Sequence, residues 1–236
     1  MKIRFVSLAG IAGVGLLTTS IADAHVSVAS GPAIADTSQE VAFGVGHGCS
    51  DTDTYRVTVD IPAGVTSVRP LRSDFGPFTV TKDGTGNVTS VTWQKPDAEL
   101  HTGDPAYYKL VIRLKTPKAP FTKIYFPTHQ VCKVPGGAEL PVVDWVGTPT
   151  LPDGGSTAPE GAPTLVVMPA RTAGWNKYSI PVAIKDLSVF FKDAAVVWKG
   201  SAAYSSNANT TAQLKAESGV TELKELAAGD EVWVRY

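Results

Sequence analysis

Four histidines and two cysteines are the residues of this 236-residue chain that point most directly to metal chemistry. His25 stands apart because it follows Ala22-Asp23-Ala24, which has the small-x-small form that signal peptidases accept. Cleavage after Ala24 makes His25 a terminal residue that offers a metal its α-amine and its ring Nδ1 in one chelate. Both nitrogens can exchange a proton for a cation near neutral pH, and nitrogen ligands of this kind suit Cu(II). The alternative interpretation is that His25 is only the residue at which a signal ends.

The first 24 residues have the composition of a secretory signal peptide. Lys2 and Arg4 give a positive start, and an apolar run of small side chains covers residues 5–17. We therefore expect residues 1–24 to be a signal peptide cleaved after Ala24, and a periplasmic or secreted location for the rest. The rest has a net charge of about −2, no basic stripe for nucleic acid and no apolar run of about 20 residues, so we expect no transmembrane segment.

Cys49 and Cys132 are the only cysteines. Disulfides persist in the compartments that exported proteins reach, so we expect these two residues to be bonded to each other. Closing such a long loop stabilises a fold by about 4–5 kcal/mol in the chain-entropy model. A thiolate metal site and a reactive thiol are the alternatives, and the lack of a CxxC pair disfavours both.

Short alternating patterns predict an all-β structure for residues 25–146. Val41, Phe43 and Val45 alternate with smaller residues, and similar runs separated by turn residues follow along the chain. Seven or more short strands of this kind are typical of an immunoglobulin-like β-sandwich.

The composition changes after this region. Residues 147–164 are rich in Pro, Gly, Ser and Thr, which predicts an extended linker. The pattern of residues 165–236 predicts a small β-rich (α+β) module. It predicts one short helix from Ile184 or Lys185 through Phe191 and a second over 211–217 or 221–226. At about 70 residues this module is near the lower limit for an independent core, so we expect its tryptophans to be buried: Trp175, Trp198 and Trp233.

Five motifs occur in a fixed order in the first region: His25-Val-Ser-Val28, Gly46-His47-Gly48-Cys49, Val57-Thr-Val-Asp-Ile61, Tyr125-Phe126-Pro127 with Cys132, and Val143-Asp144-Trp145. Together they resemble the YcnI-like (DUF1775-type) family of exported bacterial copper-binding domains over about residues 25–160. The resemblance implies an immunoglobulin- or cupredoxin-like β-sandwich. It also implies Cu(II) held by a mono-histidine brace at the processed N-terminus, with a glutamate and a nearby tryptophan.

Residue by residue, the resemblance makes His25 the brace histidine and Trp145 the tryptophan. Glu40 is the candidate glutamate, with Gln39 one position away as the alternative. A solvent-facing carboxylate is the other interpretation of Glu40, and a core residue that of Trp145. The partners implied are a copper ion and, as exchange partners, a membrane copper transporter or another periplasmic copper carrier.

The end of the chain has a separate and weaker resemblance. Gly174-Trp175-Asn176 and the closing Gly229 to Val234 are similar to small β-modules appended to bacterial exported proteins. That resemblance brings no chemistry with it, and the role of residues 165–236 stays open.

Three functions remain at this point. The first, which is not enzymatic, is a copper(II)-binding protein that acts as a chaperone, buffer or trafficking protein. The second is an oxidative copper enzyme, which needs a further histidine from His47, His101 or His129 to complete three nitrogens. The third is a metal-free structural or adhesive protein. In addition, a Cys49–Cys132 bond would bring His47 and His129 close enough to suggest a secondary metal site.

Overall fold

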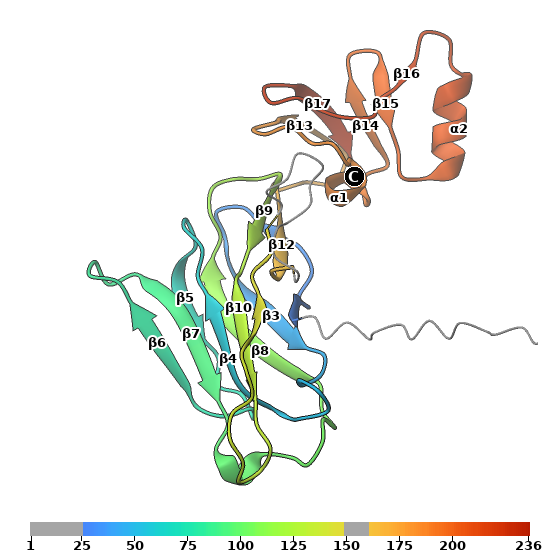
Figure 1. Ribbon diagram of the computed structural model, residues 1–236. Coiled ribbons are helices and arrows are strands. Elements are labelled where there is room, and N and C mark those ends of the chain that lie inside the picture. The colour runs from blue at the N-terminus through green and yellow to red at the C-terminus, as the bar shows by residue number, and fades with distance from the viewer. Residues whose placement is uncertain (1–25, 149–160) are drawn as a thin grey trace, which may run out of the picture.

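The computed structural model of the chain describes residues 26–148 and 161–236. Two antiparallel sheets lie face to face in the first part of the molecule (Figure 1). The first sheet has the order β1 (Val26–Val28), β3 (Ser38–Val45), β8 (Tyr108–Lys115) and β5 (Thr66–Pro70). The second has the order β11 (Val143–Trp145), β10 (Thr128–Cys132), β4 (Thr54–Asp60), β7 (Val88–Gln94) and β6 (Phe78–Lys82). The predicted all-β immunoglobulin-like sandwich is confirmed.

The core of this sandwich lies between the two sheets. Val41, Phe43 and Val45 of β3 have no exposed surface, as their alternation predicts, and the ring of Phe43 meets that of Phe126 edge to face at 5.2 Å. Trp93 and Trp145 belong to the same core. The only helical turn among the described residues of this part is η1 (Asp97–Glu99).

A small third sheet adds a strand from after the Pro/Gly-rich segment to the sandwich. It has the order β2 (Ala33–Ile34), β12 (Thr164–Met168) and β9 (Thr122–Tyr125). Leu165 and Val167 of β12 are fully buried in the sandwich core. The chain therefore completes the sandwich with β12 before it enters the C-terminal module.

The C-terminal module is a five-stranded sheet with two short helices. The strand order is β13 (Trp175–Ser179), β17 (Glu231–Arg235), β14 (Val196–Lys199), β15 (Ala202–Tyr204) and β16 (Thr221–Glu222). The first helix, α1 (Ser188–Phe191), ends where the sequence predicts but begins later than the predicted Ile184 or Lys185. The second, α2 (Ala208–Ala216), begins earlier than either predicted range, because the Asn207 side chain accepts hydrogen bonds from the N–H groups of Asn209 and Thr210.

The prediction that the three tryptophans of this module are core residues is wrong. Trp175 is 50% exposed, Trp233 is 51% exposed, and Trp198 is half-buried. The sheet packs its other face against α1, where alternate residues of the same strands are fully buried: Val197, Val232 and Val234. A module of this size covers one face of its sheet and leaves uncovered the other face, which carries the three tryptophans.

One side chain of the sandwich completes the core of the C-terminal module. Phe121 lies just before β9, and its ring contacts the rings of Tyr178, Phe190 and Phe191 at 5.4, 5.9 and 5.5 Å. Its backbone has a φ of 60°, which is costly for a bulky residue and persists only where the surroundings enforce it. The module and the sandwich are therefore packed together. Within the described residues, no helix is long and apolar enough to cross a membrane.

Candidate functional site

The first described strand begins beside the loop that carries His47. Val26 opens β1, is 1% exposed and pairs with Val45, which closes β3. Only Gly46 separates Val45 from His47. The start of β1 and the imidazole of His47 therefore belong to the same end of the first sheet. The prediction that His25 binds the metal concerns a residue outside the described part of the chain.

The loop after His47 is tightly folded. Gly48 packs so closely against the carbonyl oxygen of Thr52 that a Cβ atom would overlap it. Cys49 and Thr52 exchange backbone hydrogen bonds of 3.1 and 3.0 Å around Ser50 and Asp51. Both central residues have positive φ values, 48° and 57°, which is the conformation of a type I′ turn. The turn fixes the backbone conformation of the loop that follows His47.

The predicted disulfide between Cys49 and Cys132 is confirmed. It joins the loop after β3, in the first sheet, to the end of β10, in the second. The backbone N–H of Cys49 also donates to the Cys132 sulfur at 2.8 Å. The bond therefore clamps the two sheets together at the end where His47 lies.

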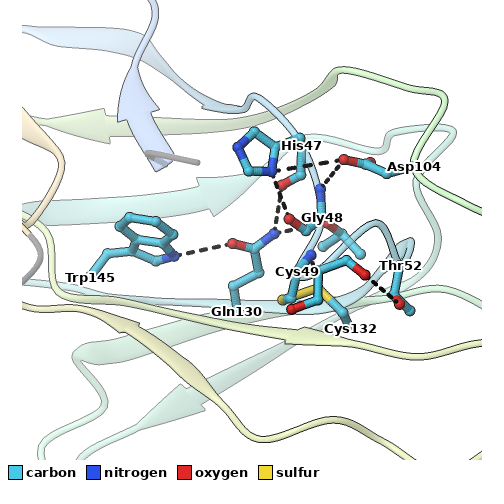
Figure 2. Close-up of a disulfide and its surroundings, with 10 residues drawn as sticks. His47, Gly48, Cys49, Thr52, Asp104, Gln130, Cys132 and Trp145 are labelled. Carbon is cyan, nitrogen blue, oxygen red and sulfur yellow. Dashed lines mark hydrogen bonds and ion pairs between the residues drawn. A yellow bond between two sulfur atoms is a disulfide. The ribbon is translucent and has the colours of Figure 1, made fainter. Parts of the chain in front are cut away.

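Gln130 connects His47 to Trp145 through buried hydrogen bonds (Figure 2). Its side-chain amide donates to the His47 carbonyl oxygen at 2.9 Å and to the Thr54 hydroxyl at 2.9 Å. Its carbonyl oxygen accepts from the indole Nε1–H of Trp145 at 3.1 Å. Gln130 is 1% exposed and Trp145 is 3% exposed, so both are fixed in the wall of the sandwich. The structure thus brings Trp145 and His47 to one place.

The His47 ring and a carboxylate lie on the side of the loop away from the disulfide (Figure 2). The ring Nδ1 is 2.7 Å from the Gly48 carbonyl oxygen, so a proton on Nδ1 would leave the imidazole lone pair on Nε2. Asp104 Oδ2 accepts the Gly48 N–H at 2.5 Å and is 3.9 Å from His47 Nδ1. The other oxygen, Asp104 Oδ1, is buried and has no hydrogen-bond partner among the described residues.

A buried ion pair supports this loop from behind. The Asp53 carboxylate, with no exposed surface, accepts from Lys95 Nζ at 2.6 Å, from the Tyr108 hydroxyl at 2.7 Å and from the His101 N–H at 2.9 Å. Burial raises the pKa of Asp53, but these three hydrogen bonds and the Lys95 charge lower it more, so its pKa is below the ordinary value. Burial and the Asp53 carboxylate raise the pKa of Tyr108. The network keeps a carboxylate ionised beneath the turn.

The candidate ligand Glu40 lies elsewhere on β3. It is exposed and pairs with Arg113 of β8. It lies five positions before Val45, which at about 3.4 Å per residue is roughly 17 Å along the strand. The structure therefore does not bring Glu40, or its neighbour Gln39, to the end that holds His47 and Trp145.

His129 points away from His47. On β10 its side chain faces the opposite side from that of Gln130, since neighbouring residues of a strand alternate. His129 Nδ1 is 2.6 Å from Asp144 Oδ1, and its Nε2 is 3.3 Å from Asp60 Oδ2. Burial lowers the pKa of His129, but the two carboxylates raise it more, so its pKa is above the ordinary value. The secondary His47–His129 site suggested by the sequence does not form.

The described residues do not complete a metal site by themselves. Within 26–148 and 161–236, no three His, Cys, Asp or Glu side chains converge as a metal ion requires. His101 contributes its backbone N–H to Asp53 and has an exposed side chain, as expected of a turn residue. Among the described residues, the His47 end offers one imidazole and the Asp104 carboxylate.

Two polar residues of the site were not recognised in the sequence. Gln130 sits at an inward position of β10 between buried Thr128 and buried Cys132, so period-two alternation with a long polar residue was the available signal. Asp104 lies in an irregular segment, where no periodic signal exists. Its role follows only from the packing of that segment against Gly48.

Comparisons with known proteins agree with this fold. The profile of the family described as "Domain of unknown function (DUF1775)" matches residues 25–167. A solved structure from Nocardia farcinica, described as an uncharacterized protein with an immunoglobulin-like fold, is 24% identical, with a TM-score of 0.50. That similarity covers 61% of this chain and 98% of the other, and at this identity it shows the fold alone. No curated protein matches the chain.

Proposed function

The chain belongs to the DUF1775 family, and from that premise we propose that it is an exported copper(II)-binding protein that stores, buffers or passes on Cu(II). The proposed ligands are the α-amine and ring nitrogen of His25, freed by removal of a signal peptide after Ala24, and the imidazole of His47. The proposed location is the periplasm or the cell exterior. The proposed exchange partners are a membrane copper transporter or another copper carrier.

The pairing of Val26 with Val45 is the observation that carries this proposal. In the sequence, His25 directly precedes Val26, the first residue of β1. Val26 itself is fixed in the sheet opposite Val45, two residues before His47. This place of Val26 at the end that carries His47 is what supports the proposal that His25 and His47 share one metal ion.

The donor chemistry of this end fits Cu(II) better than a hard cation. Imidazole and amine nitrogens favour Cu(II), which also stands at the top of the divalent affinity series. The Asp104 carboxylate adds a negative charge next to His47, with one oxygen that no described residue satisfies. Trp145 cannot ligate through its nitrogen, because an indole N–H is only a donor and this one is bonded to Gln130. Its ring forms part of the wall.

His47 takes the place that the family resemblance would give to a glutamate. Glu40 lies too far along β3, whereas His47 follows Val45 at the end where β1 begins. The proposed set is therefore three nitrogens rather than two nitrogens and a carboxylate.

Copper titration against a competing chelator tests the proposal with two forms of the protein. The form that begins at His25 should bind one Cu(II) tightly. The form that retains Ala24 has an amide in place of the amine, and its affinity for Cu(II) should fall by more than about 100-fold. Even the loss of a residue that only hydrogen-bonds to a metal ligand costs about 10- to 100-fold in affinity. Equal affinity of the two forms would contradict the proposal.

A pair of histidine variants tests the internal ligand. His47→Ala should lower Cu(II) affinity by about 100-fold or more, whereas His101→Ala, an exposed imidazole outside the site, should leave it unchanged. Affinity should also fall as the pH drops, because protons compete for the same nitrogens. Equal losses in the two variants would show that His47 has no special role.

A copper-dependent oxidative enzyme is the second candidate function. The position of His47 favours it, because three nitrogens are also what such an enzyme needs. Consumption of oxygen and ascorbate by the Cu(II)-loaded protein separates the two. The carrier proposal predicts a rate no greater than that of the His47→Ala variant mixed with the same amount of copper. A faster rate would favour the enzyme.

A further inference from the structure

The sheet of the C-terminal module has two chemically different faces. The inner face carries valines that pack against α1 and the ring of Phe121. The outer face carries Trp175 from β13, Trp233 from β17 and Trp198 from β14. Trp175 and Trp233 are half exposed and Trp198 is partly buried. Three of the five tryptophans of the chain therefore lie on this one outer face.

The strand register places the three indoles next to one another. Trp198 and Trp233 are directly paired across β14 and β17. Trp175 pairs with Arg235, two residues from Trp233 on the same face of β17. Directly opposite Cβ atoms in a sheet are about 5 Å apart and diagonal neighbours about 7 Å apart. The three rings line a shallow open hollow of about 350 Å³.

We propose that this surface, called here the tryptophan face (Trp175, Trp198 and Trp233), binds a β-1,4-linked polysaccharide chain through stacking of its sugar rings. Large apolar side chains gathered on an exposed surface mark binding sites. A pyranose ring offers a flat patch of C–H groups to an indole and hydroxyls around its edge. A chain whose successive rings lie in one ribbon matches three neighbouring indoles on a sheet.

The area of the tryptophan face argues against a second copy of this chain as its occupant. A tryptophan buries at most about 250 Å², so the exposed halves of Trp175 and Trp233 offer roughly 250 Å² together, and Trp198 adds less. A stable protein interface needs about 800 Å² on each partner. The face has the size of a few sugar rings.

The charges at the rim also fit sugar hydroxyls. Lys177 and Glu231 form an ion pair of 2.7 Å beside Trp233, and exposed Arg235 lies beside Trp175. The rim therefore offers both donors and acceptors, which a hydroxyl can use at once. The two cations disfavour a cationic ligand. A proline-rich peptide is disfavoured because proline has no N–H to donate to Glu231. An anionic lipid surface is disfavoured because Lys177 and Arg235 beside Glu231 do not form a polybasic patch.

Titration of the whole chain from His25 with chitohexaose and cellohexaose, followed by tryptophan fluorescence and calorimetry, tests this proposal. At least one of the two should bind, and Trp233→Ala or Trp175→Ala should weaken binding by about tenfold or more. Tyr107→Ala removes an exposed aromatic ring of the sandwich and should change nothing. Unchanged circular dichroism and melting temperature of the tryptophan variants would show that the fold is intact.

Four results would overturn the proposal. They are no binding of either sugar up to about 10 mM, binding that the two tryptophan variants retain, equal binding of the coiled chain maltohexaose, and a tryptophan-dependent interaction with another partner in the absence of sugar binding. Sedimentation of the protein alone tests for a dimer. Polyproline peptide and phosphatidylglycerol vesicles test the other two occupants.

Discussion

The sandwich and the C-terminal module treat tryptophan in opposite ways. In the sandwich, Trp93 has no exposed surface and Trp145 is 3% exposed, because both side chains lie in the core between two sheets that cover each other. In the C-terminal module, one sheet has one covered face, and its tryptophans occupy the other. Tryptophan is therefore a core residue in the first region, whereas in the second it forms the surface that we propose to bind sugar. Burial is set by how many layers the chain can build, and only then by hydrophobicity.

The two regions also differ in how they hold polar groups. The sandwich buries Asp53 with Lys95, and Gln130 with the Trp145 indole, and the members of each pair are hydrogen-bonded to each other near His47. The charges at the tryptophan face stay at its exposed rim. The first arrangement suits a rigid site with fixed ligands, and the second suits a surface that stacks on a flat ligand. The predictions below test whether the two regions respond separately.

The largest effect is expected from loss of the disulfide. Cys49→Ser opens a link across 83 residues and should lower the free energy of unfolding by about 4–5 kcal/mol. Because the bond clamps the His47 end, Cu(II) affinity should fall as well, while sugar binding at the tryptophan face should persist below the melting transition. Chemical denaturation measures the stability change. If Cys49→Ser and the Cys49→Ser/Cys132→Ser double variant lost different amounts, an effect beyond the bond would be acting.

The next effect concerns the contact between the regions. Phe121→Ala removes a buried ring from the module core and should cost about 4 kcal/mol. The loss should appear in the module, so the fluorescence of exposed tryptophans should change at lower denaturant than in the unmodified chain. Phe78→Ala, at a partly exposed position of edge strand β6, is the control and should cost less than about 1 kcal/mol. A single transition shifted as a whole would show that the two regions unfold as one unit.

A pH-dependent effect is expected from the buried pair. Asp53→Asn leaves Lys95 buried without its counter-charge and should cost about 3 kcal/mol at pH 7. The folded-state pKa of Asp53 is lowered, so its contribution is complete above the ordinary value of about 3.9 and is lost as the pH falls through the folded value. The difference from the unmodified chain should therefore shrink below about pH 4. Asp97→Asn, in an exposed pair with Lys133, should cost about 0.5 kcal/mol or less.

The smallest effect is expected at His129. Its folded-state pKa is raised, so its contribution is complete below the ordinary value of about 6.5 and is lost as the pH rises through the folded value. His129→Asn should cost less than about 1 kcal/mol at pH 5.5 and close to nothing at pH 9, because the groups are partly exposed. Thermal melts at the two pH values measure this. A larger loss at pH 9 would reverse the assignment.

The sequence was most informative where local pattern and covalent chemistry decide the structure. Alternation predicts that Val41, Phe43 and Val45 are core residues, and the presence of only two cysteines predicts that they are bonded to each other. Both follow from constraints that act along or between a few residues. The sandwich follows from repeating such strands.

The sequence failed where the outcome depends on which surfaces meet. Alternation on β13, β14 and β17 separates the two faces of a sheet but does not say which face is covered, so the prediction that the tryptophans are core residues is wrong. The family resemblance makes Glu40 the candidate glutamate, and only the strand register shows its distance from Val26. Phe121 reaches the module core from a backbone conformation that no propensity favours.

The most direct test of the central claim is pulsed electron paramagnetic resonance of the Cu(II)-loaded protein, labelled with ¹⁵N in histidine and beginning at His25. We predict that copper couples to two different histidine rings, and that His47→Ala removes one of them while His101→Ala and Trp233→Ala remove none. Identical couplings in the unmodified and His47→Ala proteins would contradict a copper site built between the start of β1 and the loop after β3.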